Sequence, residues 1–164
     1  MEELYPLLVV VHVAGAFLFA LAHGVSLFVS FRLRRERELE RVRALLDLSA
    51  STVGVVYGSL VLLLLAGVWA MIWHGWWRYG WPWLALAVLL GVAVHMSQRG
   101  TVHYVRVRHA AGLRAYGDPP GRPAPPAAPD VLRRLLAAPR AEELALSGGM
   151  GFLVITWCMV AKPF

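Results

Sequence analysis

The chain has 164 residues, of which 59% are hydrophobic and only 16% are charged. A water-soluble domain carries more charge than this, so the composition excludes an ordinary soluble globular protein. The formal net charge of +6 comes without any DNA- or RNA-binding motif, and we expect no nucleic-acid partner. The single cysteine, Cys158, excludes an internal disulfide and any CxxC metal or redox site.

Four long apolar runs predict four membrane spans, at about residues 5–31, 48–73, 81–98 and 144–161. Each run is long enough for a helix to cross the hydrocarbon core of a bilayer. Acidic Glu2 and Glu3 precede the first run, which is too long for a secretory signal, so we expect no cleaved leader. The sequence therefore predicts an all-α fold, a single integral membrane domain built as an antiparallel four-helix bundle.

The segments between the spans differ strongly in charge. Of the 16 Lys and Arg residues, all but Arg78 and Lys162 lie in the segments that follow the first and third spans. The positive-inside rule predicts that these two segments face the cytoplasm. Both termini are then expected to lie outside.

The connecting segments carry further signals in chain order. After the first span, RLRRERELERVRALLDLS mixes Arg and Glu at helical spacings and predicts a solvated helical continuation of that span. The outer turn WHGWWRYGWPW predicts an interfacial aromatic belt, and the alternative is the lining of a quinone or haem site. The third span continues into a basic helical stretch, TVHYVRVRHAAGL. The proline-rich residues 117–130 then predict an extended cytoplasmic linker.

Small residues occur at helical spacing in two spans. Gly54 and Gly58 form a G-x-x-x-G motif in the second span, and Ser147, Gly148, Gly149 and Gly151 give the fourth span a similar patch. Such residues let helix backbones approach closely. The motif predicts either packing of the four helices within the bundle or a homodimer face through Gly54 and Gly58, and it does not separate the two.

Four of the six histidines lie in or beside the predicted spans. They are His12, His23, His74 and His95, whereas His103 and His109 lie in the basic stretch and are read as solvated residues. Eleven residues separate His12 from His23, which places both on one helix face about 16 Å apart along the axis. Polar side chains inside a span usually face the bundle interior, because exposure to lipid is unfavourable.

The depths of these histidines along their spans predict two pairs. His23 and His95 each lie five residues past the centre of their span, about 7.5 Å towards the cytoplasm. His12 lies about 9 Å outside the centre of the first span, and His74 ends the second span about 12–16 Å outside its centre. We therefore predict that His95 faces His23 at an inner level and that His74 faces His12 at an outer level.

Facing imidazoles in an apolar cage are the axial ligands of b-type haem. His12, His23, His74 and His95 are thus predicted as haem iron ligands, and two levels would suit one or two haem b groups. The predicted function is electron transfer within the lipid bilayer, with quinone or a respiratory protein as the redox partner. The sequence identifies no catalytic residue.

Other functions remain open at this point. A proton relay would use the near-neutral pKa of imidazole, but no Asp, Glu or Lys accompanies the histidines within the spans. A bare metal site, with Met71 or Met96 beside histidine, would suit copper and a metal or small-solute permease. A non-enzymatic scaffold or accessory subunit of a membrane complex would need the histidines only as hydrogen-bonding groups that fix helix register.

The first span, LLVVVHVAGAFLF, resembles a broad group of bacterial four-helix membrane proteins. That group includes the copper-resistance D-type proteins and the four-helix protoporphyrinogen oxidase. The layout HGVSLFVSFRLRRER, then RALLDLS, then a closing span ending in KPF looks most like an uncharacterised family, domain of unknown function 2269. The resemblance implies a multi-pass protein of the bacterial cytoplasmic membrane and His12 as the ligand-type histidine.

Overall fold

The computed structural model describes residues 4–164, so Glu2 and Glu3 and the expectation built on them lie outside the described residues. Over that range the chain is helical and has no β-strand. Four helical stretches are long and apolar enough to cross a membrane: Leu4–Leu33, Leu39–Trp73, Gly80–Ala110 and Pro129–Ala161. The predicted all-α class and the four apolar helices are confirmed.

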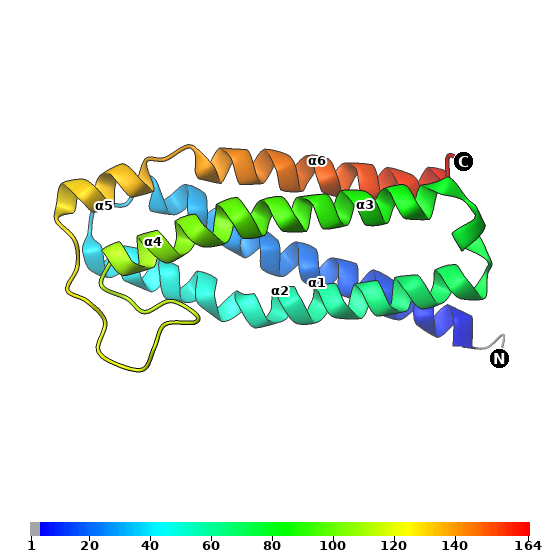
Figure 1. The fold of residues 1–164 in the computed structure, drawn as a ribbon, viewed down its shortest axis with the longest axis horizontal. Coiled ribbons are helices and arrows are strands. Elements are labelled where there is room, and N and C mark those ends of the chain that lie inside the picture. Colours follow the sequence, from blue (N-terminus) through cyan, green and yellow to red (C-terminus); the bar gives the residue numbers. More distant parts are fainter. Residues whose placement is uncertain (1–3) are drawn as a thin grey trace.

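The four long helices lie side by side as a bundle (Figure 1). Helices α1 (Leu4–Leu33) and α2 (Leu39–Trp73) form one hairpin. A single 3-10 turn, η1 (Trp76–Arg78), leads to α3 (Gly80–His95), which continues through a π-helical segment, η2 (Met96–Thr101), into α4 (Val102–Ala110). Helix α5 (Pro129–Leu136) precedes α6 (Arg140–Ala161), which returns along α3.

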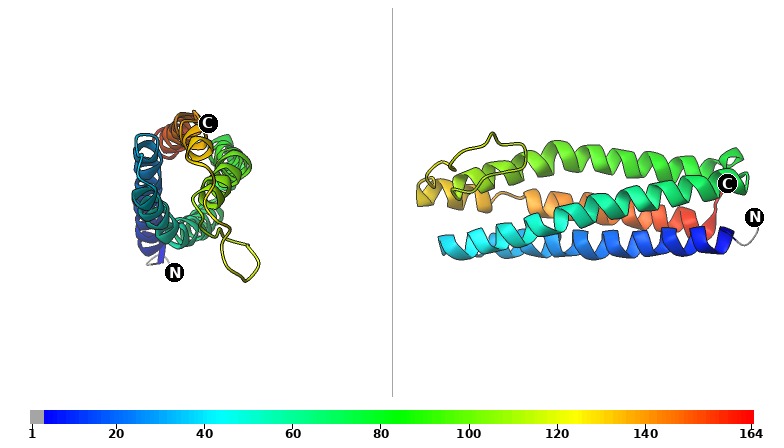
Figure 2. Two further views of the ribbon diagram at one scale, coloured as in Figure 1. Left: turned by 90° about the vertical axis from the view of Figure 1, so that its left-hand side faces the viewer. Right: turned by 90° about the horizontal axis from the view of Figure 1, so that it is seen from below.

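Seen along its length, the bundle is a ring in the order α1, α2, α3, α6 (Figure 2). The most extensive contacts join α1 to α2 and α3 to α6. Leu4 and residue 164 lie at one end, which we call the aromatic end because the 73–83 turn lies there (Figure 1). The opposite end, which we call the arginine end, holds residues 32–43 and 106–140.

The buried positions of α1 recur at a seven-residue spacing. They are Gly15, Ala22 and Val29, and Leu33 follows one turn later. A Cβ atom at Gly15 would lie 3.2 Å from the backbone nitrogen of Leu63, so glycine permits the close approach of the two backbones. The hydroxyls of Ser26 and Thr52 are hydrogen-bonded at 2.9 Å across the same contact.

Helix α1 ends at Leu33, so the predicted helical continuation of the first span is wrong. The chain reverses over residues 34–38, where the Glu36 N–H donates to the Leu33 carbonyl. The Glu36 carboxylate then accepts the N–H groups of Arg37 and Glu38, ahead of the first residue of α2. These backbone hydrogen bonds hold the pKa of Glu36 below its usual range. The mixed Arg and Glu stretch therefore lengthens α2 instead of α1.

The arginine end has a packed apolar core of its own. The Leu46 carbonyl in α2 accepts hydrogen bonds from the Tyr104 hydroxyl at 2.8 Å and from the Arg108 guanidinium at 3.1 Å, which dock α4 on α2. Residues 117–128, within the predicted linker, contain no regular helix. The buried apolar side chains of this core come from α1, α2, α4, the residue after it, and α5: Val29, Leu33, Val42, Leu46, Val107, Ala110, Ala111, Leu132 and Leu136.

The aromatic end is tied to the end of α6. Buried Trp81, Ala85 and Cys158 form a small core between α3 and α6. The Trp81 N–H donates to the Phe164 carbonyl at 3.2 Å, and the Phe164 ring covers Gly80, where a Cβ atom would lie within 2.6 Å of it. Backbone contact therefore fixes the last residues of the chain against the start of α3.

Gly54 and Gly58 do not pack helices within the bundle, so that use of the G-x-x-x-G motif is wrong. A Cβ atom at either position would meet nothing within 4 Å among residues 4–164. Close approaches between helices occur instead at other glycines, such as Gly15, Gly67 and Gly151. The homodimer face through Gly54 and Gly58 stays a prediction.

Candidate functional site

His23 of α1 and His95 of α3 both approach α6, at neighbouring residues. The Nε2 atom of His23 lies 3.3 Å from the position that a Cβ atom of Gly148 would occupy. His95 lines a groove with Ser147, the residue before Gly148. The two imidazoles therefore lie at one level of the bundle, on helices that flank α6 from two sides (Figure 2).

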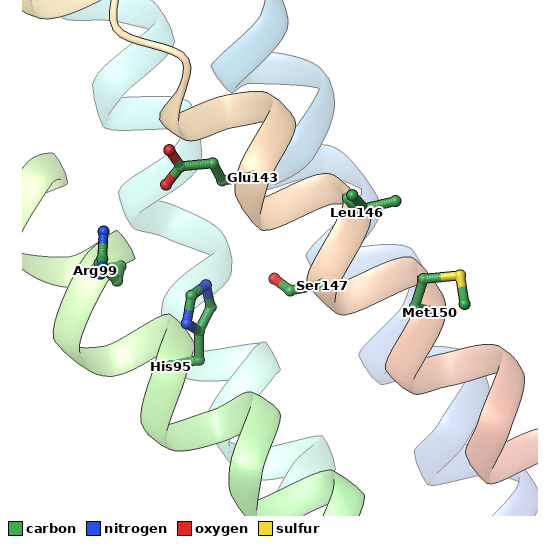
Figure 3. Close-up of a pocket in the computed structure, with 6 residues that line it drawn as sticks. All are labelled: His95, Arg99, Glu143, Leu146, Ser147 and Met150. Carbon is green, nitrogen blue, oxygen red and sulfur yellow. The ribbon is translucent and has the colours of Figure 1, made fainter.

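The groove lies between α3 and α6 towards the arginine end and has a volume of about 440 Å³. His95 and Arg99 form one wall, on successive turns, and face Glu143 and Ser147 of α6 (Figure 3). Leu146 and Met150 add apolar surface. The groove thus contains an imidazole, a guanidinium, a carboxylate and a hydroxyl beside the apolar side chains of Leu146 and Met150.

A π-helical segment shapes the α3 wall of this groove. It begins at Met96, directly after His95, and contains Arg99. Single π turns are rare and occur frequently at functional sites, because the extra residue re-aims the side chains around it. Gly100 within the segment would bring a Cβ atom within 3.3 Å of Leu144, so glycine also admits α6 at this point.

His23 packs against an aromatic ring of its own helix. Its ring stacks on that of Phe19, with centroids 5.6 Å apart and planes within 3° of parallel. The side chain is partly buried. Because Gly148 has no side chain, the imidazole edge can approach the backbone of α6. An imidazole held in this way is restricted in orientation, as a ligand must be.

His12 belongs to the contact between α1 and α2. Its Nδ1 atom lies 2.9 Å from the Leu63 carbonyl oxygen, and its ring edge lies 2.8 Å from the position that a Cβ atom of Gly67 would occupy. Since a carbonyl oxygen only accepts, Nδ1 carries a proton, which in the corresponding neutral tautomer leaves Nε2 as the acceptor. His12 therefore has one ring nitrogen committed to packing and one available to an acceptor or ligand role.

His74 lies at the aromatic end, away from His12. Its ring contacts Tyr5 edge-on, with centroids 4.0 Å apart, and stacks on Trp76 at 4.8 Å. Lys162 places its ammonium 4.5 Å from the centre of the Trp76 ring. His12 is level with Gly67, and seven residues of α2, about 10 Å, separate Gly67 from His74. The structure therefore does not bring the predicted outer pair together.

The residues that complete the groove were not singled out as a site in the sequence. In the sequence Arg99 contributes only to the charge asymmetry, and Glu143 belongs to no motif. A signal was present, since Glu143 and Ser147 are four residues apart on one helix and His95 and Arg99 are four apart on another. What the sequence lacked was the rotation of α3 and α6 that turns these two rows towards each other.

The donor set limits the chemistry of the site. Among residues 4–164, no three His, Cys, Asp or Glu side chains are grouped so as to hold a bare metal ion. An iron porphyrin, by contrast, needs only axial ligands from the protein, since the ring supplies the other four.

Four helices that are long and apolar enough to cross a membrane fit a multi-pass α-helical membrane protein. Comparison with known proteins adds no closer assignment: no family model, no curated protein and no solved structure matches this chain.

Proposed function

We propose that this protein binds b-type haem and transfers electrons within a membrane, with His23 and His95 as the axial ligands. The observation that carries the proposal is the approach of both imidazoles to α6 at Ser147 and Gly148, from helices on either side of it. A hexacoordinate haem takes two axial imidazoles that face each other across the porphyrin plane, and in this proposal His23 and His95 supply them.

Such a group would have to enter between the imidazoles and α6. Gly148 receives the edge of the His23 ring, Gly149 is exposed and adds no side chain to the α6 surface, and Phe19 stacks on His23. Haem, when bound, supplies one-electron redox chemistry. The protein residues would hold the iron, exclude water with apolar side chains and tune the potential through the charges of the groove.

The outer level receives no haem in this proposal. His12 donates to the Leu63 carbonyl and retains Nε2, but His74 lies about two turns of α2 away from its level. His74 instead stacks in the aromatic cluster with Tyr5 and Trp76. One haem is therefore the proposed stoichiometry, and His12 is assigned to helix packing.

The charge asymmetry sets the proposed orientation. The arginine end, and with it the His23–His95 level, faces the cytoplasm, and the aromatic end faces outside. The proposed location is the bacterial cytoplasmic membrane, in line with the resemblance to the uncharacterised domain of unknown function 2269. A quinone within the same bilayer is the proposed redox partner, because both the groove and the quinone pool are reached through lipid.

An optical titration tests the proposal. The protein is purified in a non-ionic detergent and titrated with haem, and spectra are recorded oxidised and after dithionite. We expect a Soret band with the low-spin pattern of two histidine ligands. His23→Ala and His95→Ala should each convert this to a high-spin spectrum and weaken binding, whereas the control His109→Ala, on the exposed α4 face, should change neither. No Soret band on the wild type would contradict the proposal.

A non-enzymatic accessory subunit is the second candidate, favoured by a different observation. His12 is used as a packing residue against Leu63 and Gly67, which is what a purely structural histidine does. This candidate predicts that no histidine substitution changes any spectrum and that a partner protein co-purifies in mild detergent. The same titration therefore separates the two functions.

A further inference from the structure

The groove between α3 and α6 lies where both helices change between apolar and charged residues. On α3 the apolar run ends at His95, and the exposed Arg99 follows one turn later. On α6 the order is reversed, because Glu143 stands in the first turn and the apolar residues follow it. Arg99 and Glu143 both line the groove (Figure 3). In a membrane-spanning chain, this level is where the lipid headgroups meet the hydrocarbon core.

The two walls of the groove offer opposite hydrogen-bonding groups. On the α3 wall, the Arg99 guanidinium only donates, in a planar fork that matches phosphate and carboxylate groups. On the α6 wall, Glu143 uses Oε2 to accept from the Arg140 guanidinium at 2.6 Å, which leaves Oε1 to accept from another donor. The Ser147 hydroxyl donates to the Leu144 carbonyl at 3.2 Å, so its oxygen also accepts. One wall therefore suits an anion and the other suits a cation that carries N–H groups.

Apolar side chains continue the groove from this polar part into the span. Leu146 and Met150 line it there, and their side chains are 68% and 54% exposed. A ligand with hydrocarbon along these two side chains would place its polar group between Arg99 and Glu143. The groove therefore fits an amphiphile that has both a positive and a negative charge in its polar part.

We propose that this groove binds a phospholipid whose headgroup carries a phosphate and a primary ammonium, as that of phosphatidylethanolamine does. Arg99 donates to the phosphate, and the ammonium donates to the Glu143 carboxylate and the Ser147 oxygen. The acyl chains lie along Leu146 and Met150. A purely basic pocket between membrane helices favours an anionic lipid, whereas the acceptors on the α6 wall require a donor cation as well. Other arginines at this end are also exposed, so the α6 wall sets the specificity.

Native mass spectrometry of the purified protein in a non-ionic detergent tests the proposal without added haem. The protein is titrated with phosphatidylethanolamine, phosphatidylcholine and phosphatidylglycerol of identical acyl chains, and a dissociation constant is taken from the bound fraction. We expect phosphatidylethanolamine to bind about tenfold more tightly than the other two, because only its headgroup offers Glu143 a charged N–H donor. Equal affinities for the three lipids, or a preference for either of the others, would overturn the proposal on the wild type alone.

Two substitutions separate the contributions of the two walls. Glu143→Gln should lower the affinity for phosphatidylethanolamine about tenfold, to the level of phosphatidylcholine, and leave phosphatidylcholine binding unchanged. Arg99→Gln should weaken all three lipids by a similar factor, because all three carry the phosphate. Glu142→Gln, the neighbouring carboxylate that pairs with Arg34, and Arg106→Gln on α4 do not alter the lining of the groove and should bind as wild type.

The remaining outcomes would each overturn the proposal. A loss of phosphatidylethanolamine affinity in Glu142→Gln as large as in Glu143→Gln would show a general effect of charge and no site. A loss in Arg99→Gln that is confined to phosphatidylglycerol would assign the groove to an anionic lipid. The proposed function is tested separately, since the lipid contacts use neither His23 nor His95 as an iron ligand. A missing Soret band would leave the lipid preference standing, and a missing lipid preference would leave the optical titration unaffected.

Discussion

The Nδ1 atom of His12 lies 2.9 Å from the backbone carbonyl oxygen of Leu63, across the contact between α1 and α2. The ring reaches this carbonyl because the next turn of α2 presents Gly67, which has no side chain to obstruct it. An imidazole in an otherwise apolar span is thus satisfied by a backbone group of the neighbouring helix. This pairing fixes the register of the α1–α2 hairpin and is directly testable.

Gly67→Ala should destabilise the protein. The added Cβ atom would lie 2.8 Å from Cε1 and 2.9 Å from Nδ1 of His12, so the ring must move and its hydrogen bond is lost. Overpacking of this kind costs about 1–3 kcal/mol, partly offset by the higher helix propensity of alanine. We expect a lowered thermal unfolding midpoint in detergent, followed by tryptophan fluorescence.

The same experiment contains its own controls. Gly58→Ala lies on the same helix, but its Cβ atom meets nothing within 4 Å among residues 4–164, so it should be neutral or slightly stabilising. The double variant His12→Ala/Gly67→Ala should be more stable than Gly67→Ala alone, since the clash is gone. A double variant no better than the single one would contradict the steric explanation.

Leu46→Ala tests whether stability is concentrated at the arginine end. Leu46 is fully buried in the core where α1, α2, α4 and α5 meet. Its truncation should lower the free energy of unfolding by about 2–5 kcal/mol, as for other buried leucines. Leu65→Ala, on the same helix but 68% exposed on the apolar surface, should change it by less than about 0.5 kcal/mol. Similar losses in both variants, measured by denaturant unfolding in mixed micelles, would show that no separate core exists there.

The helical class and the four spans followed from the sequence because length and hydropathy decide which segments can cross a bilayer. Hydropathy says nothing about rotation of one helix against another. For that reason the sequence could not tell that Gly54 and Gly58 face outward while Gly15 and Gly67 carry the helix contacts. A glycine motif predicts that close approach is possible, but the partner helix determines where it happens.

The histidines show the same limit of prediction from the sequence. Depth counting predicted one level for His23 and His95, and both meet α6 at neighbouring residues, because rise per residue is nearly constant along a helix. The outer pairing of His12 with His74 depended on the end of a span, where a turn and a stacking partner such as Trp76 redirect the side chain. The position of Arg99 in the groove could not be predicted, because a π-helical turn has no signature in the amino-acid composition.

Sidedness can be measured with single cysteines. In a Cys158→Ala background, Tyr116→Cys reports the 112–128 segment and Tyr79→Cys reports the turn at the aromatic end; both positions are exposed. The positive-inside rule predicts that a membrane-impermeant maleimide labels Tyr79→Cys in right-side-out vesicles and Tyr116→Cys only in inverted ones. Labelling with the opposite sidedness would place the arginine end, and the groove, outside.

Asp118 should give the segment after α4 a defined acid sensitivity. Its carboxylate accepts the Ala115 N–H at 2.6 Å and the His109 Nε2–H at 2.9 Å. The backbone hydrogen bond first, and the histidine second, hold the pKa of Asp118 below its usual range. A carboxyl whose pKa is lower in the folded state stabilises its surroundings above the unfolded pKa. That stabilisation is lost as the pH falls through the folded pKa.

The Ala115 amide shift, followed by NMR in micelles as the pH is lowered, measures this directly. We expect it to titrate with a midpoint below about 3.9, the ordinary value for aspartate. His109→Ala should raise the midpoint only partly, because the Ala115 N–H remains as the larger cause. Asp118→Asn should abolish the titration, and a midpoint at or above the ordinary value in wild type would refute the turn geometry. Since the turn lies outside the spans, neither substitution should alter a Soret band, which separates this local device from the site between α1, α3 and α6.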